Sequence, residues 1–315
     1  MIAFVLSGGG NRGALQAGAL QALLERGIVP DLIVGTSVGA LNSVVLAADP
    51  TAAAARRQAE GWAHIRRSDV FPGNTLTVGW RILTGQGSFH SRESFARFVL
   101  ATLPPNVRRF KDLEVPCLVT ATALASGRLR LFGDDPNERL LDALLASTAI
   151  PPFYAPYPYR NELLLDGALV ANLPLSHAIA RGARTIYTLE IIDDMATSGR
   201  PGLIYTLTSS LNAMLNRQHE QERHTVALAH ARGITIHDIR LTSGQNLVYN
   251  DFSRSAALVA AGERAALEYL DALPAARPAP LARLTESLRM AIRTAAAARR
   301  TAAPPSAPLP PATAG

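Results

Sequence analysis

A serine stands between two glycines at a point where the sequence passes from an expected strand to an expected helix. The motif Gly35-x-Ser37-x-Gly39 follows the apolar run 32–34 and precedes a helical pattern. A serine on such a sharp turn projects its hydroxyl at the helix N-terminus, and its neighbours must be small because a side chain two residues away would collide across the turn. The amide of Val38 can then help to hold an oxyanion. The pattern predicts a nucleophilic serine, with an ordinary strand-to-helix turn as the alternative.

A second glycine-rich segment, residues 8–13 (GGGNRG), follows the first apolar run and also opens a helical pattern. It satisfies G-x-G-x-x-G, which is typical of dinucleotide-binding proteins. That function also requires an acidic residue about 20 positions later, at the end of the second strand. Asp31 is at about that distance but precedes the strand, and the Ser37 turn stands where the acid is expected. Dinucleotide binding is therefore one of two functional interpretations of this segment.

The other interpretation is that this segment forms an oxyanion hole. The amides of Gly9, Gly10 and Asn11 at a helix N-terminus can face Ser37 from the adjacent strand end. Arg12 would supply positive charge for a substrate anion such as a phosphate. A tight turn that only allows close helix packing is the structural alternative.

A nucleophilic serine needs a base, and the candidates are few. Asp166 follows the apolar run 163–165, so its carboxylate is expected at a strand end. A conventional triad would add a histidine, and His177 follows Asp166 in the order Ser, Asp, His. However, His177 lies in a helical pattern, a turn or more from the strand end. Asp166 is therefore the preferred base.

The other histidines and the cysteine indicate no metal site. His219 and His224 are five residues apart, or about 140° around a helix, so they do not form the i, i+4 pair that chelates a metal. We expect both to be solvated. The single cysteine, Cys117, excludes an internal disulfide framework and a cysteine-rich zinc site.

The elements that position these residues alternate between strands and helices. The unit of strand, glycine turn and helix occurs twice before residue 50. This alternation predicts an α/β fold with a mainly parallel sheet, helices on both faces and ligands at the carboxyl ends of the strands. Further helices are expected near 51–67, 91–103, 138–147, 174–182, 203–231 and 255–272, and further strands near 117–121, 129–132, 163–165, 185–191 and 234–240.

Composition and charge exclude several classes of protein. The chain has 315 residues, of which 48% are hydrophobic, enough for a large core. It contains no run of about 18 apolar residues that would span a bilayer, and residues 1–6 lack the features of a signal peptide. We therefore expect a cytoplasmic protein. Net charge is +6, but +5 of it lies beyond residue 276, and the aromatic content of 6% offers little for base stacking. Nucleic-acid binding is not expected.

The C-terminal part differs in composition from residues 1–276, the expected catalytic domain. Residues 277–300 predict a basic amphipathic helix with apolar residues on one face and arginines on the other. Through residues 281–300 it can lie on an anionic membrane surface, at the inner membrane face, or instead pack on the domain. Residues 301–315 are rich in proline and alanine and predict a disordered tail.

Four segments together resemble the patatin-like phospholipases, particularly bacterial members related to neuropathy target esterase. They are residues 8–13, 35–39, 147–151 (STAIP) and 166–168 (DGA), in that order and spacing. The resemblance is good over residues 1–195 and loose to 272, and it has no counterpart for the tail. It implies a three-layer α/β/α fold and a dyad without histidine, with Ser37 as nucleophile and Asp166 as base. It also implies an oxyanion hole at Gly8, Gly9 and Gly10. Ala168 stands where many members have glycine.

The resemblance implies a serine hydrolase of phospholipase A or lysophospholipase type, which cleaves carboxylic esters of phospholipids or lysophospholipids without a metal or organic cofactor. Two alternatives stay open: a nucleotide-binding oxidoreductase that uses the first glycine turn, and a non-catalytic membrane-associated scaffold. Residues 151–159 can line an acyl groove or form a packed loop. Trp80, Ile82 and Leu83 can belong to a lid or to the core.

Overall fold

The computed structural model describes residues 1–71, 88–193, 202–245, 247–248 and 250–273. The chain divides into two units, Met1–Leu270 and Asp271–Gly315, and the fold below is that of the first. Three expectations concern parts of the chain outside the described residues: a lid or core role for Trp80, Ile82 and Leu83, the basic helix 277–300 and the tail 301–315.

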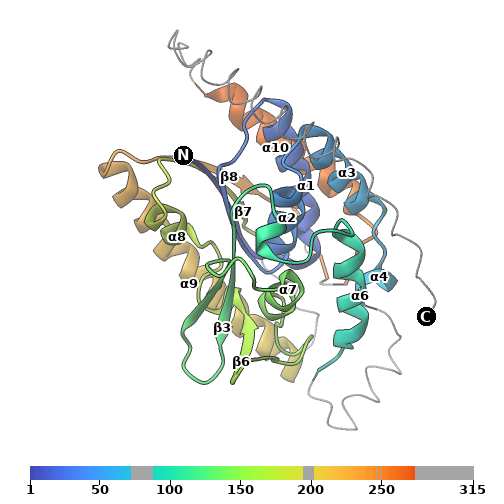
Figure 1. Ribbon diagram of the computed structural model, residues 1–315. Coiled ribbons are helices and arrows are strands. Elements are labelled where there is room, and N and C mark those ends of the chain that lie inside the picture. The colour runs from blue at the N-terminus through green and yellow to red at the C-terminus, as the bar shows by residue number, and fades with distance from the viewer. Residues whose placement is uncertain (72–87, 194–201, 246, 249, 274–315) are drawn as a thin grey trace, which may run out of the picture. The chain divides into compact units, whose positions relative to one another are not determined.

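An eight-stranded sheet forms the centre of the first unit (Figure 1). Its order is β5-β6-β3-β2-β1-β7-β8, and β4 also pairs with β3. Five neighbouring strands are mutually parallel: β3, β2, β1, β7 and β8. Strands β4 and β6 run antiparallel to β3. The strands are β1 (Ile2–Leu6), β2 (Leu32–Thr36), β3 (Cys117–Ala123), β4 (Leu129–Phe132), β5 (Tyr157–Tyr159), β6 (Glu162–Asp166), β7 (Thr185–Ile191) and β8 (Thr235–Leu241).

Helices cover both faces of the sheet, which gives the expected three layers (Figure 1). On one face are α1 (Gly13–Glu25), α2 (Val38–Ala48), α3 (Ala52–His64), α4 (Arg67–Val70), α6 (Arg92–Thr102), α7 (Leu140–Ser147) and α10 (Ser255–Ala272), and on the other are α8 (Leu175–Ala180) and α9 (Leu203–Ala231). Short 3-10 turns lie at η1 (Gly10–Arg12), η2 (Phe110–Asp112) and η3 (Gly167–Leu169).

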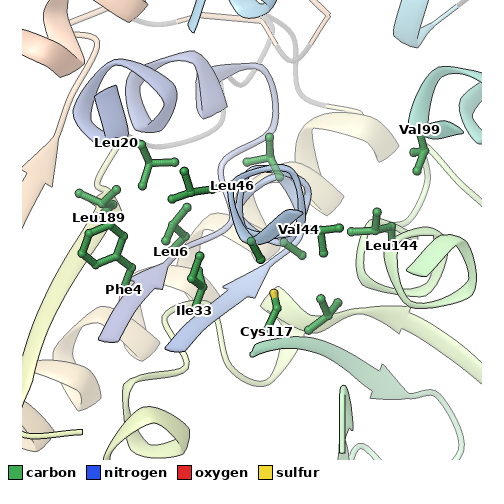
Figure 2. Close-up of a cluster of buried hydrophobic side chains, with 14 of the residues drawn as sticks. Phe4, Leu6, Leu20, Ile33, Val44, Leu46, Val99, Cys117, Leu144 and Leu189 are labelled. Atoms are coloured by element: carbon green, nitrogen blue, oxygen red, sulfur yellow. The ribbon is translucent and has the colours of Figure 1, made fainter. Parts of the chain in front are cut away.

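Alternation along the strands supplies both cores. Phe4 and Leu6 of β1 pack under α1 and α2, together with Leu20, Ile33 and Leu46 (Figure 2). The intervening residues of the same strands belong to the second cluster, with α8 and α9: Ala3, Val5, Leu32 and Val34. A parallel strand buried on both faces is apolar at nearly every position, which is why β1 and β2 read as continuous apolar runs.

Two expected elements differ from the structure. The helix expected over 51–67 is α3, which ends at His64 because Ile65 and Arg66 adopt extended backbone, and the short helix α4 begins at Arg67, where the expected helix was to end. Strand β5 falls in the proline-rich connection where no strand was expected; it pairs only with β6, at the edge of the sheet. Proline is tolerated there because an edge strand needs fewer ladder donors.

Among the helices of the described residues, none combines the length and apolarity required to cross a membrane.

Candidate active site

Ser37 occupies a strained turn between β2 and α2. Its φ of 55° and ψ of −124° place a non-glycine residue in a sparsely populated region. An added Cβ on Gly35 would lie 2.4 Å from Ser43 Oγ, and one on Gly39 would lie 2.5 Å from the Ser7 carbonyl oxygen. The Ser37 amide donates to Ser147 Oγ at 2.8 Å. Both flanking glycines are therefore required by close packing, and Ser147 holds the turn from α7.

The carboxylate of Asp166 lies directly against this serine. Ser37 Oγ donates to Asp166 Oδ2 at 2.7 Å, while Asp166 Oδ1 accepts the Ala168 amide at 2.8 Å. The side chain of Asp166 is fully buried. Burial raises the pKa of Asp166 to about 7, although the hydrogen bonds from Ala168 and Ser37 oppose the shift. The carboxyl group is thus poised near neutrality, where a general base works best.

The register of β3 explains why these two side chains meet. Thr36, the last residue of β2, pairs with Thr120, and Asp166, the last residue of β6, pairs with Ala121. Because β2 is parallel and β6 antiparallel to β3, the two strands reach the same point of β3 from opposite directions. Asp166 is at a strand end as expected, and because that strand is antiparallel to β3, its register on β3 brings the carboxylate to Ser37.

The glycine turn lies against the nucleophile. An added Cβ on Gly8 would be 3.3 Å from Ser37 Cβ, and one on Gly9 would be 2.5 Å from Ile191 Cδ1. The Gly8 amide donates to the Asn172 carbonyl oxygen at 3.3 Å and to Asn172 Oδ1 at 3.1 Å. The expectation that Gly8 supplies an oxyanion donor is therefore wrong, because its only N–H is already engaged.

The remaining candidate amides are differently placed. Within the described part of the chain, the N–H groups of Gly9, Gly10, Asn11 and Val38 have no acceptor. All four residues line the pocket that contains Ser37. The side chain of Asn11 is turned away to the carbonyl oxygens of Val248 and Asp251, at 2.9 and 2.6 Å. These backbone donors are available to a ligand in the pocket.

Arg12 lines the same pocket but is compensated within the chain. Its guanidinium is 2% exposed, lies 3.5 Å from Asp193 and donates to the Leu247 carbonyl oxygen at 3.1 Å. A buried arginine with its own carboxylate partner has little net charge to offer a substrate anion. The role of Arg12 in binding such an anion stays a prediction.

The pocket combines an apolar and a polar wall. Residues of α3, α4, α6 and the loop after α7 form the apolar wall: Trp62, Val70, Phe71, Phe95, Phe98, Phe153 and Tyr154. Phe153 and Tyr154 belong to the segment 151–159, and their place in the pocket agrees with the interpretation that this segment lines an acyl groove. Tyr154 also donates its hydroxyl to the Val70 carbonyl oxygen at 3.1 Å. The polar wall contains Asn172, Asp193 and, from α9, Asn212, Asn216 and His219.

The structure separates the histidines. His177 is half-buried on α8 next to Ser176, does not line the pocket, and no contact of the described residues joins it to Asp166. His224 is exposed. The expectation that His219 is solvated is wrong: it lines the pocket, and its Nδ1 lies 2.5 Å from Glu190 Oε1. Position on α9 alone could not reveal this, because the partner comes from β7.

Three polar residues of the site were not singled out from the sequence. Ser147 holds the Ser37 amide, and Asn172 holds that of Gly8. Gln218 in turn accepts the Asn172 amide at 2.7 Å and donates to the Ala168 carbonyl oxygen at 2.9 Å. Ser147 begins the segment STAIP, whose sequence does not indicate that its serine accepts the Ser37 amide. Asn172 and Gln218 carry no local signal, since each works through tertiary contacts.

Metal and dinucleotide binding find little support. In the ranges that the structure describes, no group of three or more His, Cys, Asp or Glu residues could hold a metal. Asp31 accepts the Ile2 amide at 2.9 Å. It therefore lies at the amino ends of β1 and β2, opposite the glycine turn, and cannot hold the ribose of a dinucleotide bound there.

Several known proteins are similar to this chain in sequence. Patatin-like phospholipase domain-containing protein 6 of Mus musculus is 29% identical over 191 residues, and domain-containing protein 7 of Rattus norvegicus is 31% identical over 194; each match covers 60% of this chain and 13% of the relative. Lysophospholipase NTE1 of Mycosarcoma maydis is 28% identical over 199 residues, which cover 61% of this chain and 10% of the relative. The chain thus spans about an eighth of the length of the first two relatives.

A solved structure, VipD from Legionella pneumophila, has a TM-score of 0.48 and 14% identity, with 85% of this chain and 66% of that chain covered. The family model for Patatin-like phospholipase matches residues 4–179, more than half of the chain, and includes both glycine turns, Ser37 and Asp166. The chain belongs to the patatin-like phospholipase family.

Proposed function

We propose that the protein is a serine lipid acyl hydrolase of phospholipase A or lysophospholipase type, which cleaves carboxylic ester bonds through Ser37 and Asp166. The observation that carries this proposal is the 2.7 Å hydrogen bond from a strained serine to a fully buried carboxylate in a pocket with one apolar wall. Family membership and the lipid-related names of the relatives support the substrate class.

In the proposed acylation, Asp166 takes the proton of Ser37 as Oγ attacks the ester carbonyl carbon. The carbonyl oxygen becomes the oxyanion, and the amides of Gly9 and Gly10, with that of Val38, donate to it. Collapse of the tetrahedral intermediate breaks the ester C–O bond and releases the alcohol product, which takes the proton from Asp166. Asp166 then takes a proton from a water molecule whose oxygen attacks the acyl carbon. The bond from that carbon to Ser37 Oγ breaks, Oγ regains the proton from Asp166, and the fatty acid is released.

The two walls of the pocket suggest how the substrate lies. The apolar wall has the aromatic character that an acyl chain requires, and the polar wall can hydrogen-bond the glycerol and headgroup portion. The ester group between them would lie at Ser37. Contact with a membrane through residues 281–300 remains a proposal, and liposome pelleting of the full chain against a chain ending at residue 276 tests it.

The experiment that tests the proposed function is labelling with a fluorophosphonate probe and peptide mass mapping, combined with hydrolysis of a lysophospholipid. We expect an adduct on Ser37 that is lost in Ser37→Ala and sharply reduced in Asp166→Asn. The matched control is Ser176→Ala, which removes an exposed serine next to His177 and should retain both label and turnover. Absence of an adduct on folded wild-type protein would overturn the proposal.

A further inference from the structure

Behind the two turns of the site lies a chain of buried polar side chains that the reaction itself does not use. Gln16 of α1 donates from Nε2 to the Ser7 carbonyl oxygen at 2.8 Å and to the Leu189 carbonyl oxygen at 3.1 Å. Its Oε1 accepts Asn42 Nδ2 at 3.0 Å. Ser7, Gln16 and Asn42 are each at most 1% exposed. One amide side chain therefore ties the end of β1, just before the glycine turn, to β7 and to α2.

Asn42 extends this chain to a residue of the pocket wall. Its Nδ2 also donates to the Gly13 carbonyl oxygen at 3.0 Å, and its Oδ1 accepts Trp62 Nε1 at 2.8 Å. Trp62 lies against the start of α1, because an added Cβ on Gly13 would be 2.9 Å from its ring. We call Ser7, Gln16, Asn42 and Trp62 the amide network. Every side-chain N–H of Gln16 and Asn42 has an acceptor. Gln58 Nε2 also donates to Asn42 Oδ1 at 3.0 Å, while Gln58 Oε1 has no hydrogen-bond partner among the described residues.

The network joins the starts of the two helices that follow the two turns. Gln16 lies in the first turn of α1, which begins at Gly13 after the glycine segment, and Asn42 lies about one turn after Val38, where α2 begins. Ser7 adds a second tie: its Oγ donates to the Gly8 carbonyl oxygen at 3.0 Å and accepts the Ile191 amide at 2.9 Å. The network is thus attached to the backbone on both sides of the glycine turn.

Burying these amides is costly unless they are fully paired, and full pairing fixes one arrangement of the elements that they join. An apolar contact between α1 and α2 could slide by fractions of an ångström without losing much, whereas these hydrogen bonds lose strength when distances or angles change. Stabilisation of an oxyanion depends on the same small distances between donor and nucleophile. The arrangement therefore does more than fill space between helices.

We propose that Gln16 and Asn42 are positioning residues that hold the amides of Gly9 and Gly10 at a fixed separation from Ser37. Neither side chain lines the pocket, so neither touches the substrate. They act through the backbone of Ser7 and Gly13 and through the packing of α2 on α1. The inference rests on the proposed function, because it concerns the geometry of that reaction.

The test uses Gln16→Met and Asn42→Leu, which keep side-chain size but cannot hydrogen-bond, in the full chain with a soluble p-nitrophenyl acyl ester. We expect kcat to fall by about tenfold to a hundredfold, as for small displacements in other active sites, while KM stays the same. The acid limb of the pH–rate profile should not move, because Asp166 keeps its surroundings. In the double variant the losses should not multiply, since the two side chains share one hydrogen bond.

The matched control is Thr188→Val, which removes a buried hydroxyl of β7 that donates to Asp238 of β8 at 2.9 Å and makes no hydrogen bond to the amide network. It should lower Tm without lowering kcat at temperatures well below Tm. If Gln16→Met and Asn42→Leu behave like this control, with lower Tm and wild-type kcat, the positioning role is overturned while the proposed function stands. If the wild-type protein neither hydrolyses esters nor takes the fluorophosphonate label, the proposed function fails and the inference falls with it.

Discussion

Two polar clusters border the site, and they differ in charge. The amide network is neutral, buried and has every amide N–H paired. The second cluster, which we call the acidic cluster, comprises Glu190, His219 and Glu222. Its Glu190 is 5% exposed and pairs with His219, while Glu222 Oε2 is buried and has no partner among the described residues.

The difference in charge implies that the two clusters have different roles. A neutral network has no group that titrates near neutral pH, which suits the side of the pocket where distances to the reacting carbon matter. The acidic cluster is sensitive to pH: burial, and next the charge of Glu190, raise the pKa of Glu222 to about 7, with His219 opposing the shift. We therefore expect substitutions near the two turns to change turnover. Substitutions in the acidic cluster should instead change substrate binding and the dependence of stability on pH.

The largest effect on turnover is expected at Asp166, the buried acid that accepts the hydrogen bond of Ser37. Asp166→Asn removes the base and should lower kcat by about 10⁴-fold, as for a comparable acid-to-amide change in a hydrolase triad. In the wild-type protein the ionised carboxylate is the active form, and burial raises the pKa of Asp166 to about 7. Turnover should therefore rise as pH increases through about 7, and initial rates from pH 5 to 9 measure it. A flat profile would show that another group limits the reaction.

The next effect is expected at the glycine turn. A side chain at Gly9 would meet Ile191, with the nearest atom 2.5 Å from an added Cβ, so Gly9→Val must displace the turn that carries the proposed donors. Loss of one oxyanion donor costs about 10²–10³ in turnover, and we expect a loss of that order in a protein that still folds, with a Tm lowered by the overpacking against Ile191. Gly61→Val is the matched control, because an added Cβ on Gly61 has no atom within 4 Å. Full activity in a folded Gly9→Val protein would exclude this placement of the oxyanion.

A smaller effect, on stability rather than turnover, is expected in the acidic cluster. Burial raises the pKa of Glu222 from 4.5 to about 7 in the folded state, so between these values the folded protein keeps a proton that the unfolded chain has lost. Stability from this group is complete below about pH 4.5 and is lost as pH rises through about 7. Glu222→Gln should therefore raise Tm at pH 8 relative to the wild type, and less at pH 5.

Thermal unfolding at the two pH values measures this difference. Glu220→Gln on the same helix is the control, since Glu220 is 64% exposed and pairs with Arg217 at the surface; it should leave Tm nearly unchanged at both values. A Glu222→Gln protein that is less stable than the wild type at pH 8 would show that the carboxylate has a compensating partner, and the contrast between the two clusters would fail.

The smallest effect is expected at His219, on the wall of the pocket. His219→Gln keeps an N–H donor for Glu190 but shortens the side chain that lines the polar wall. KM for a lysophospholipid should rise by less than about tenfold with kcat unchanged, the pattern of lost ground-state binding. His224→Gln, at an exposed position of α9, should leave both constants at wild-type values. A fall in kcat at His219 would instead assign it a part in the chemistry.

The sequence carried enough information for most of the fold. The bounds of β4, β7, α9 and α10 agree with the expected ranges. Glycines mark the ends of two of them, Gly127 and Gly133 for β4 and Gly202 and Gly233 for α9. Strand β5 was not predicted, because its Tyr-Pro-Tyr sequence has the composition of a loop and it is a strand only through its pairing with β6.

The site was predictable only in part. Sequence motifs predicted Ser37 and Asp166 as site residues, and in the structure Ser37 Oγ lies 2.7 Å from Asp166 Oδ2. The engagement of Gly8 with Asn172, the pairing of Arg12 with Asp193 and the position of His219 could not be predicted. Each depends on a partner more than a hundred residues away in the sequence or, for His219, on a separate strand, and no local pattern encodes such contacts.

Strands β2 and β6 run in opposite directions and end beside neighbouring residues of β3. This arrangement also determines where the chain tolerates insertions. Asp166 is fixed by its pairing with Ala121, whereas the turn of the β5–β6 hairpin, at Arg160, lies at the far end of β6. Residues added at that turn lengthen the hairpin without moving the carboxylate. A single residue removed between Leu164 and Asp166 would instead rotate the carboxylate to the opposite face of the sheet. The hairpin is therefore a segment whose outer end is free to vary in length while its inner end keeps the base in register.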